Sequence, residues 1–428
     1  MALAILVLAL ALAFAVSGDG GDDATPDLEG TEGDDTLSGT EGDDAMTGYG
    51  GNDLIGGNGG DDTIDGGDGS DTLSGDAGDD IIDGGDQDDF ITVDGGNDTV
   101  SGGGGSDVIF LEDGFETAVI DGGDEGEFGW DIVSSTMSGD VVVQADGQII
   151  IRTASGGVAR VVDVEEISMR GGSFDGSAAA TGHIITGFDT VTGSEFRDLI
   201  EGTAGDDVIN AGGGDDLILG TGGQDTINAG AGNDTVGSGG TIRADEQHEG
   251  LIDGGEGDDL LDAGDGMATL FGGTGNDTLS GNGTLDGGEG DDRLSGDGTL
   301  SGGEGSDRLT GGGTLDGGAG DDRLFGLSGA IVTGGDGVDV FEVSNQATRA
   351  GDAPSVIADF TPGTDRIEVY GHYTSTAGET EPVFEMIPDA NTNSVSLVVD
   401  GVVLAVVQGT TAISADDIDY RPTDGAQI

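Results

Sequence analysis

A nine-residue period runs through residues 30–110 and leaves few folds open to the chain. Consecutive blocks such as GTEGDDTLS and GNGGDDTID repeat without a change of frame. Gly holds positions one and four of all blocks but one each, Asp holds position six throughout, and an aliphatic residue or Met stands two places later. Such a period indicates a repeat architecture, in which each block is a unit that packs on its neighbours.

Each block combines a loop with a short strand. Glycine adopts positive φ without a steric penalty, so a Gly-rich loop can turn its carbonyl groups inward. The Asp at the loop's end adds a carboxylate, and carboxylates with carbonyls are the ligands of Ca²⁺. The following residues, as in Asp35-Thr36-Leu37-Ser38, alternate polar and apolar, which is typical of a strand with one buried face. Stacked blocks would line their aliphatic side chains into one inner ridge.

The blocks resemble the GGxGxDxUx nonapeptides of RTX, or haemolysin-type, calcium-binding proteins. The resemblance implies a right-handed parallel β-roll, a β-solenoid in which two blocks make one turn and alternate loops stack on one edge. It also implies that calcium lies between neighbouring loops and bridges their position-six Asp residues. One edge would carry Asp35, Asp53, Asp71, Asp89 and Asp107, and the other Asp44, Asp62, Asp80 and Asp98. The alternative, a disordered Gly- and Asp-rich linker, does not require a nine-residue period.

Charge and composition narrow the partners. The formal net charge of the 428 residues is −76, and all 11 basic residues are Arg. We do not expect the protein to bind nucleic acid, because it has few basic residues that could neutralise phosphates along a groove. A chain this acidic repels itself unless counter-ions are bound, and calcium ions would supply that charge. The absence of Cys excludes disulfides and thiolate sites.

The N-terminus predicts export. Residues 1–16 contain the uninterrupted apolar run Ala2–Val16, which is short for a membrane span and fits either a secretory signal or an N-terminal anchor. Residues 17–29 read as an acidic linker. Both interpretations place the protein outside the cell or at the cell surface. The secretion machinery would be the Sec route, or the type I route that the resemblance implies.

Two further segments continue the pattern after an interruption. Residues 111–192 form a β-rich insertion, in which Asp146-Gly147 predicts a hairpin turn. The nine-residue period returns in a second array, residues 193–237, and residues 238–253 interrupt it again. The metal-ligand candidates of the second array are Asp198, Asp207, Asp216, Asp225 and Asp234.

A third array, residues 254–342, changes the period. Nonapeptides alternate with the hexapeptides GNGTLD, GDGTLS and GGGTLD, which keep the strand and its Leu but lack the Asp of the loop. We therefore expect 15-residue turns with calcium on one edge only and fewer ions per turn than in the first array. The metal-ligand candidates here are Asp259, Asp277, Asp292, Asp307, Asp322 and Asp339.

Three arginines recur directly after the Asp in the third array, at Arg293, Arg308 and Arg323. Their position flanks the inward residue, so their side chains should face outward in a ladder. One interpretation is charge relief, and the other is a docking strip for an anionic glycan or surface. The acidic residues expected as partners under the first interpretation are Glu289, Glu304, Asp291 and Asp321.

The C-terminal segment, residues 343–428, predicts a β cap that also holds any secretion signal. Its resemblance to the RTX terminal region implies closure of the roll by aromatics such as Phe341 and Phe360. Residues 388–393 form an evident turn between two strands. The turn imitates the start of an EF-hand, but Ser394 stands where that motif needs Gly.

The sequence offers no recognisable catalytic motif. His183, His248 and His372 are scattered and form no H-E-x-x-H pair, and no G-x-S-x-G elbow stands in a strand–helix context. We expect a non-catalytic calcium-binding protein with an adhesin or matrix role, whose partner is an extracellular glycan or cell surface. The alternative is a polysaccharide-modifying enzyme, with a site on an open face of the roll or in the insertion, near Trp130, Arg152, Arg160 and Arg170.

Overall fold

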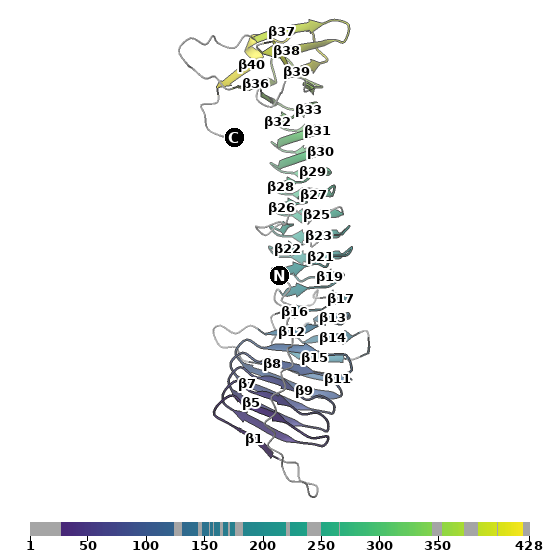
Figure 1. Cartoon of the computed structure of the whole chain (residues 1–428). Helices are drawn as coiled ribbons and strands as arrows, with labels where there is room; N and C mark the ends of the chain where they lie inside the picture. Colours follow the sequence, from purple (N-terminus) through teal and green to yellow (C-terminus); the bar gives the residue numbers. More distant parts are fainter. Residues whose placement is uncertain are drawn as a thin grey trace, which may run out of the picture. The chain divides into compact units, whose positions relative to one another are not determined.

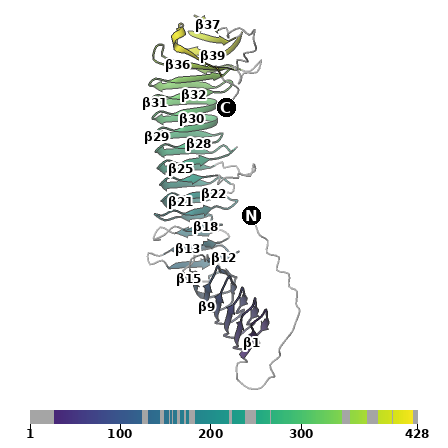
Figure 2. The ribbon, with the colours of Figure 1, turned by 90° about the vertical axis from the view of Figure 1, so that its left-hand side faces the viewer.

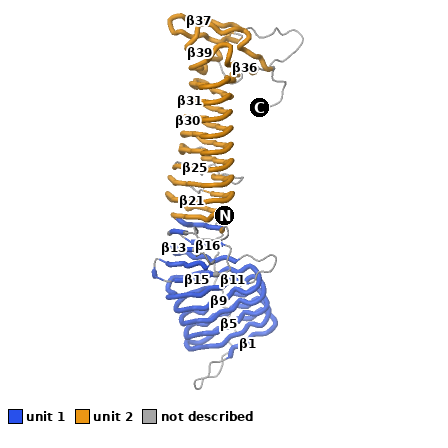
Figure 3. Tube along the Cα trace, turned by 180° about the vertical axis from the view of Figure 1, so that it is seen from behind, with its two compact units in different colours: residues 1–179, 184–188 blue, residues 180–183, 189–428 orange. Residues whose placement is uncertain are grey.

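The computed structural model is almost entirely β. It describes residues 27–123, 131–143, 148–153, 155–156, 158–162, 166–169, 172–175, 183–219, 223–237, 250–264, 266–344, 353–371, 384–399 and 401–422. Contacts divide the chain into two compact units, residues 1–179 with 184–188 and residues 180–183 with 189–428 (Figure 3). The predicted signal or anchor and most of the acidic linker lie outside the described residues. No helix of the described part is long and apolar enough to cross a membrane.

The first unit is a parallel solenoid with two walls of stacked strands (Figure 1). One wall contains β1 (Asp27–Thr31), β3 (Ala45–Tyr49), β5 (Thr63–Asp68), β7 (Ile81–Asp86), β9 (Asn97–Gly104), β11 (Thr117–Gly123) and β15 (Val158–Val162). The other contains β2 (Thr36–Ser38), β4 (Leu54–Gly56), β6 (Thr72–Ser74), β8 (Phe90–Val93), β10 (Val108–Leu111), β12 (Ile132–Ser135), β16 (Glu166–Ser168) and β18 (Ile184–Thr186).

The predicted β insertion extends this solenoid. Strand β14 (Ile149–Thr153) pairs antiparallel with β15 and with β13 (Gly139–Val143), and β13 pairs in parallel with β17 (Gly172–Asp175). The antiparallel β13–β14 pair agrees with the hairpin prediction, although the turn residues 146–147 lie outside the described part. The insertion therefore adds strands to a wall of the roll and continues it.

The second unit repeats the two-walled arrangement (Figure 2). One wall contains β19 (Thr190–Thr192), β21 (Val208–Gly213), β23 (Thr226–Ala231), β25 (Leu251–Glu256), β27 (Thr269–Thr274), β29 (Thr284–Glu289), β33 (Ile331–Asp336) and β35 (Ser355–Ile357). The other contains β20 (Leu199–Glu201), β22 (Leu217–Leu219), β24 (Thr235–Val236), β26 (Leu260–Asp262), β28 (Thr278–Ser280), β32 (Arg323–Gly326), β34 (Val340–Ser344) and β36 (Arg366–Gly371).

Two long strands belong to both walls of the second unit. Strands β30 (Arg293–Glu304) and β31 (Arg308–Ala319) each run for 12 residues and pair with each other along their whole length. Each crosses from one wall to the other through a hexapeptide, where no loop protrudes. Register partners here, such as Leu294 and Leu309, are 15 residues apart, whereas Ile64 and Ile82 of the first unit are 18 apart. The change of period in the sequence is thus a change in the length of the turn.

The C-terminal cap ends the second unit. Strands β37 (Phe384–Asp389), β38 (Ser394–Val399) and β39 (Val402–Gln408) form an antiparallel meander, and β39 also pairs with β35. Helix η1 (Ala415–Asp417) precedes β40 (Ile418–Pro422), which pairs with β36. The rings of Phe341 and Phe360 are buried with centroids 6.0 Å apart, as the aromatic closure predicted. Residues 390–393 form the predicted turn between β37 and β38.

The core is one ridge of aliphatic side chains per wall. Ile64, Leu73, Ile82 and Ile91 are each at most 2% exposed, and Leu285, Leu294 and Leu300 are buried in the same way. The side chain before each of them faces outward, as at Leu54 and Ile81, which are 52% and 55% exposed. The alternation predicted from the sequence is confirmed, and with it the parallel β-solenoid.

Substitutions of inward and outward apolar side chains should differ in their effect on the free energy of unfolding. Leu73→Ala should destabilise the calcium-loaded protein by about 3 kcal/mol, because it leaves a cavity between fixed strands. Leu54→Ala, on the outer face of a strand that pairs with the one holding Leu73, should cost under about 0.5 kcal/mol. Urea unfolding in saturating calcium compares the two variants. Similar losses of stability in both would contradict the assignment of inner and outer faces.

Candidate metal centre

The position-six Asp side chains point into the solenoid instead of toward water. Each candidate from Asp44 to Asp339 is at most 3% exposed, and Asp35 in the first turn is half-buried. An ionised carboxylate is costly to bury unless charge and hydrogen bonds compensate it. The chain places such a group at the end of nearly every loop, so compensation must recur at each one.

Backbone hydrogen bonds supply part of this compensation and join successive turns. The backbone N–H of Asp53 donates to Oδ1 of Asp71, 18 residues later, over 2.7 Å, and that of Asp71 donates to Oδ1 of Asp89 over 2.8 Å. The same bond recurs along the opposite edge, where the N–H of Asp44 donates to Asp62 and that of Asp62 to Asp80. The two edge rows expected in the first array are therefore present.

In the second unit, one edge carries an unbroken row. The same N–H to Oδ1 bond links each residue to the next through Asp198, Asp216, Asp234, Asp259, Asp277, Asp292, Asp307, Asp322, Asp339 and Asp365. We call this the aspartate edge. The row continues without a gap from the 18-residue turns into the 15-residue turns, because the turns become shorter only at the loops of the opposite edge.

The opposite edge of the second unit changes character. Asp207 and Asp225 begin it, and the equivalent places in later turns hold Gly250, Ala268, Gly283, Gly298 and Gly313. We call this the glycine edge. At these places the chain has no carboxylate to offer, so any calcium bound by Asp in residues 254–342 is restricted to the aspartate edge.

Three members of these rows were missed by the sequence analysis. Asp131 accepts the backbone N–H of Asp107 over 2.8 Å, and Asp365 accepts that of Asp339 over 3.2 Å. His183 stands where a position-six residue belongs, and its backbone N–H donates to Oδ1 of Asp198 over 2.6 Å. The available signal was a nonapeptide outside the nine-residue frame: Gly126 and Gly129 stand at positions one and four before Asp131, and Gly363 stands at position four before Asp365.

The repeated glycines of the loop are required for two different reasons. Positions two and four take left-handed backbone conformations, which suit Gly67 with φ of 103° and Gly69 with φ of 145°, although Asn58 and Asp76 also take positive φ at position two. The position-one glycines, such as Gly66, do not take this conformation. A Cβ on Gly66 would instead overlap Oδ2 of Asp71 and the carbonyl oxygen of Gly84 in the next turn. The position-one glycine makes room for the buried carboxylate.

The second carboxylate oxygen of the row defines the centre. Among the described residues, Oδ2 is buried without a hydrogen-bond donor in Asp53, Asp62, Asp71, Asp80, Asp89, Asp98, Asp216, Asp234, Asp259, Asp277, Asp292, Asp307 and Asp322. Buried polar atoms in native proteins are almost always paired, so a recurring exception points to a missing partner. A cation in each loop would supply it.

The pKa values of these buried carboxyl groups also indicate a missing partner. Burial raises the pKa of Asp89 to about 7, although a backbone hydrogen bond opposes it and the charges of Asp107 and Asp71 reinforce it. Burial likewise raises the pKa values of Asp98, Asp216, Asp259 and Asp307 to about 7. Without metal, these five carboxyl groups would therefore be partly protonated near neutral pH, and a bound divalent cation would displace the protons.

The donor set fits calcium. In the described part of the chain, no three His, Cys, Asp or Glu side chains converge on one point. A cation in these loops would therefore be held by one or two carboxylates together with backbone carbonyl oxygens. Such an all-oxygen set is typical of Ca²⁺ sites, whereas structural zinc sites use Cys and His.

The first loops of the first and second arrays are closed by their own side chains. Oδ2 of Asp35 accepts the backbone N–H of Thr31 over 2.6 Å and its hydroxyl over 2.8 Å. Asp198 receives the corresponding pair of bonds from Ser194. These end loops have a donor where the interior loops have none, so their carboxylates depend less on a cation.

The arginine row lies near the cap. Arg293, Arg308 and Arg323 are register partners, as predicted. Arg308 lies 3.8 Å from Glu342, and Arg323 pairs with both Glu342 and Glu368. These partners differ from the acidic residues that the charge-relief interpretation expected.

The arginine contacts stabilise charge at the cap. Burial opposes ionisation of Glu368, but the Tyr370 hydroxyl and the guanidinium of Arg323 outweigh it and lower the pKa of Glu368. Arg421 adds a contact of 3.2 Å to the same carboxylate. The use of the row as a docking strip stays a prediction.

The region predicted for an alternative enzymatic site is only partly described. Arg152 on β14 and Arg160 on β15 are exposed. Trp130 and Arg170, together with His248 and His372, lie outside the described residues.

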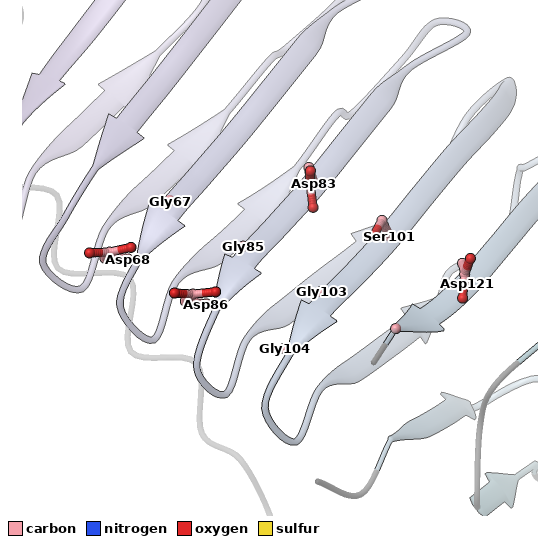
Figure 4. A pocket seen from close by; sticks show the side chains of 10 residues that line it. Gly67, Asp68, Asp83, Gly85, Asp86, Ser101, Gly103, Gly104 and Asp121 are labelled. Atoms are coloured by element: carbon pink, nitrogen blue, oxygen red, sulfur yellow. The ribbon is translucent and has the colours of Figure 1, made fainter. Parts of the chain in front are cut away.

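An acidic groove of about 700 Å³ runs along the outer face of the first unit, beside the loops (Figure 4). It is lined by glycines and Ser101 together with Asp68, Asp83, Asp86 and Asp121. Its charge adds to a field that attracts cations toward the neighbouring loops.

Comparison with known proteins identifies the repeats. The RTX calcium-binding nonapeptide repeat family matches residues 29–115, 185–240, 251–313 and 314–330 in overlapping segments, just over half of the chain. No curated protein matches the sequence. The crystal structure of the extracellular lipase LipA from Serratia marcescens aligns over 82% of this chain with 17% identity and a TM-score of 0.21. The chain spans 45% of the length of that lipase.

Interior and end loops should respond differently to loss of the carboxylate. Asp71 has row neighbours on both sides, so Asp71→Ala should weaken calcium binding at two sites, by about tenfold or more each. Asp35→Ala, in the self-closed end loop, should affect one site. Isothermal titration with calcium measures both, and Asp86→Ala on the outer groove is the matched control. Equal losses for Asp71→Ala and Asp35→Ala would argue against stacked sites.

Proposed function

This chain belongs to the family of RTX calcium-binding nonapeptide repeat proteins, and we propose that it acts outside the cell as a structural or adhesive protein whose solenoid folds on binding calcium. The observation that carries the proposal is the row of buried carboxylates with one unsatisfied oxygen in each interior loop. Like charges repeated along a wall oppose folding until a cation neutralises them.

The expected affinity favours an extracellular setting. Calcium sites of extracellular modules bind at roughly 10⁻⁴–10⁻³ M, far above the calcium concentration of the cytosol. The chain would stay unfolded during synthesis and fold after export by the type I or the Sec machinery. The net charge of −76 supports this order of events, because it disfavours a compact state in the absence of counter-ions.

The proposal includes a non-catalytic role. In the described residues, the buried acidic side chains that recur from turn to turn are the Asp residues of the rows, and Glu342 and Glu368 beside the arginine row. The outer faces repeat in register, as in the row Thr269, Thr284, Thr299 and Thr314. A repeating surface suits a repeating partner such as an extracellular glycan or a cell surface. Binding to a glycan array in calcium, and its loss in chelator, would test the adhesive part.

Folding itself gives the direct test of the proposed function. Circular dichroism should report an unfolded chain in chelator and a cooperative change to a β spectrum as calcium rises into the millimolar range. Magnesium at the same concentration is the control, because it demands octahedral geometry and dehydrates reluctantly. A β spectrum that chelator leaves unchanged would sink the proposal.

A further inference from the structure

The residue before each buried Asp forms a second row. Position five of the first array holds Asp, Asn or Ser in every loop from Asp34 to Ser106. In most pairs of turns, the backbone N–H of one position-five residue donates to Oδ1 of the position-five residue 18 places earlier. These bonds run from Asn52 to Asp34 (2.9 Å), Asp61 to Asp43 (2.9 Å), Ser70 to Asn52 (3.2 Å), Asp79 to Asp61 (2.9 Å), Asn97 to Asp79 (3.0 Å) and Ser106 to Asp88 (2.9 Å).

The two rows point in opposite directions along the stack. The N–H of Asn52 donates back to Asp34 in the preceding turn, and the N–H of its neighbour Asp53 donates forward to Asp71 in the following turn. Each loop is therefore held from both sides at two adjacent residues. The backbone N–H groups of Asn52 and Asp53 both donate hydrogen bonds to neighbouring turns, so neither N–H dipole is free to point at a cation in the loop.

The position-five bond does not depend on the metal loop. On the aspartate edge of the second unit, the N–H of Asn276 donates to Asp258 over 2.7 Å. On the glycine edge, the N–H of Gly312 donates to Asp297 over 2.9 Å, although the next residue there is Gly313. The bond thus forms with and without a neighbouring position-six carboxylate. It is a property of the stacked turns.

We propose that the position-five Asp and Asn side chains are positioning residues for calcium. Their bonds fix the distance between neighbouring loops as the turns stack, so that the calcium ligands are held at their spacing in the folded state. The inference rests on the proposed calcium-dependent folding. It assigns to these exposed side chains a role in calcium affinity that requires a hydrogen-bond acceptor and does not require a negative charge.

The test uses the full-length protein and three variants in one array. Asp61→Ala removes the acceptor for the N–H of Asp79, whereas Asp61→Asn keeps an acceptor and loses the charge. Ser70→Ala is the matched control, because within the described residues no backbone N–H of the next turn donates to its side chain. Calcium titration followed by circular dichroism gives the midpoint, and hydrogen exchange in saturating calcium gives the protection of the Asp79 amide.

Asp61→Ala should raise the calcium midpoint about threefold and expose the Asp79 amide to exchange, as expected for loss of one hydrogen bond. Asp61→Asn should restore both readouts, and Ser70→Ala should match the wild type. A calcium-responsive wild type with Asp61→Ala no different from Ser70→Ala would overturn the inference alone. The inference would also be overturned if Asp61→Asn were as defective as Asp61→Ala, because loss of the negative charge would then explain the weaker calcium binding. A wild type that does not respond to calcium would overturn the proposed function and the inference with it.

Discussion

Stacked carboxylates of one sign, buried between successive turns, are the constraint on which this structure depends. Strands of a sheet lie about 4.8 Å apart, and like charges at that distance repel by roughly 3 kcal/mol at an effective dielectric constant of about 20. The solenoid repeats this repulsion at every interior loop of its Asp rows. One oxygen of each carboxylate is occupied by a backbone N–H of the preceding turn, and the other is left for a cation.

Much of the local sequence follows from accommodating this carboxylate. Position-one glycine leaves space for Oδ2, as Gly66 does for Asp71, and glycines at positions two and four take the left-handed conformations of the loop. The first loops of the first and second arrays carry Thr31 or Ser194 to satisfy that oxygen internally. The position-five side chains then hold the same loops in register from the opposite direction.

The regular parts of the fold could be predicted because they are local. The Asp rows, the aliphatic ridges and the shorter turns of the third array all follow from spacings of nine and six residues. Asp131 and Asp365 were not predicted, because they stand 24 and 26 residues after the preceding Asp of their rows and so fall outside the nine-residue frame. The pairing of Arg323 with Glu368 was not predicted for a related reason, since Glu368 lies on β36, whose register with β34 is not set by the repeat spacing. The position-five ladder was visible as a bias toward Asp and Asn, but its direction is a matter of backbone geometry.

Diffraction from crystals grown in calcium, with anomalous scattering used to locate the ions, tests the central claim most directly. The account predicts peaks about 2.3–2.6 Å from position-six Asp oxygens. They should lie along both edges of residues 30–110 and along the aspartate edge alone in residues 254–342. Peaks on the glycine edge, or Asp rows without any peak in saturating calcium, would contradict it.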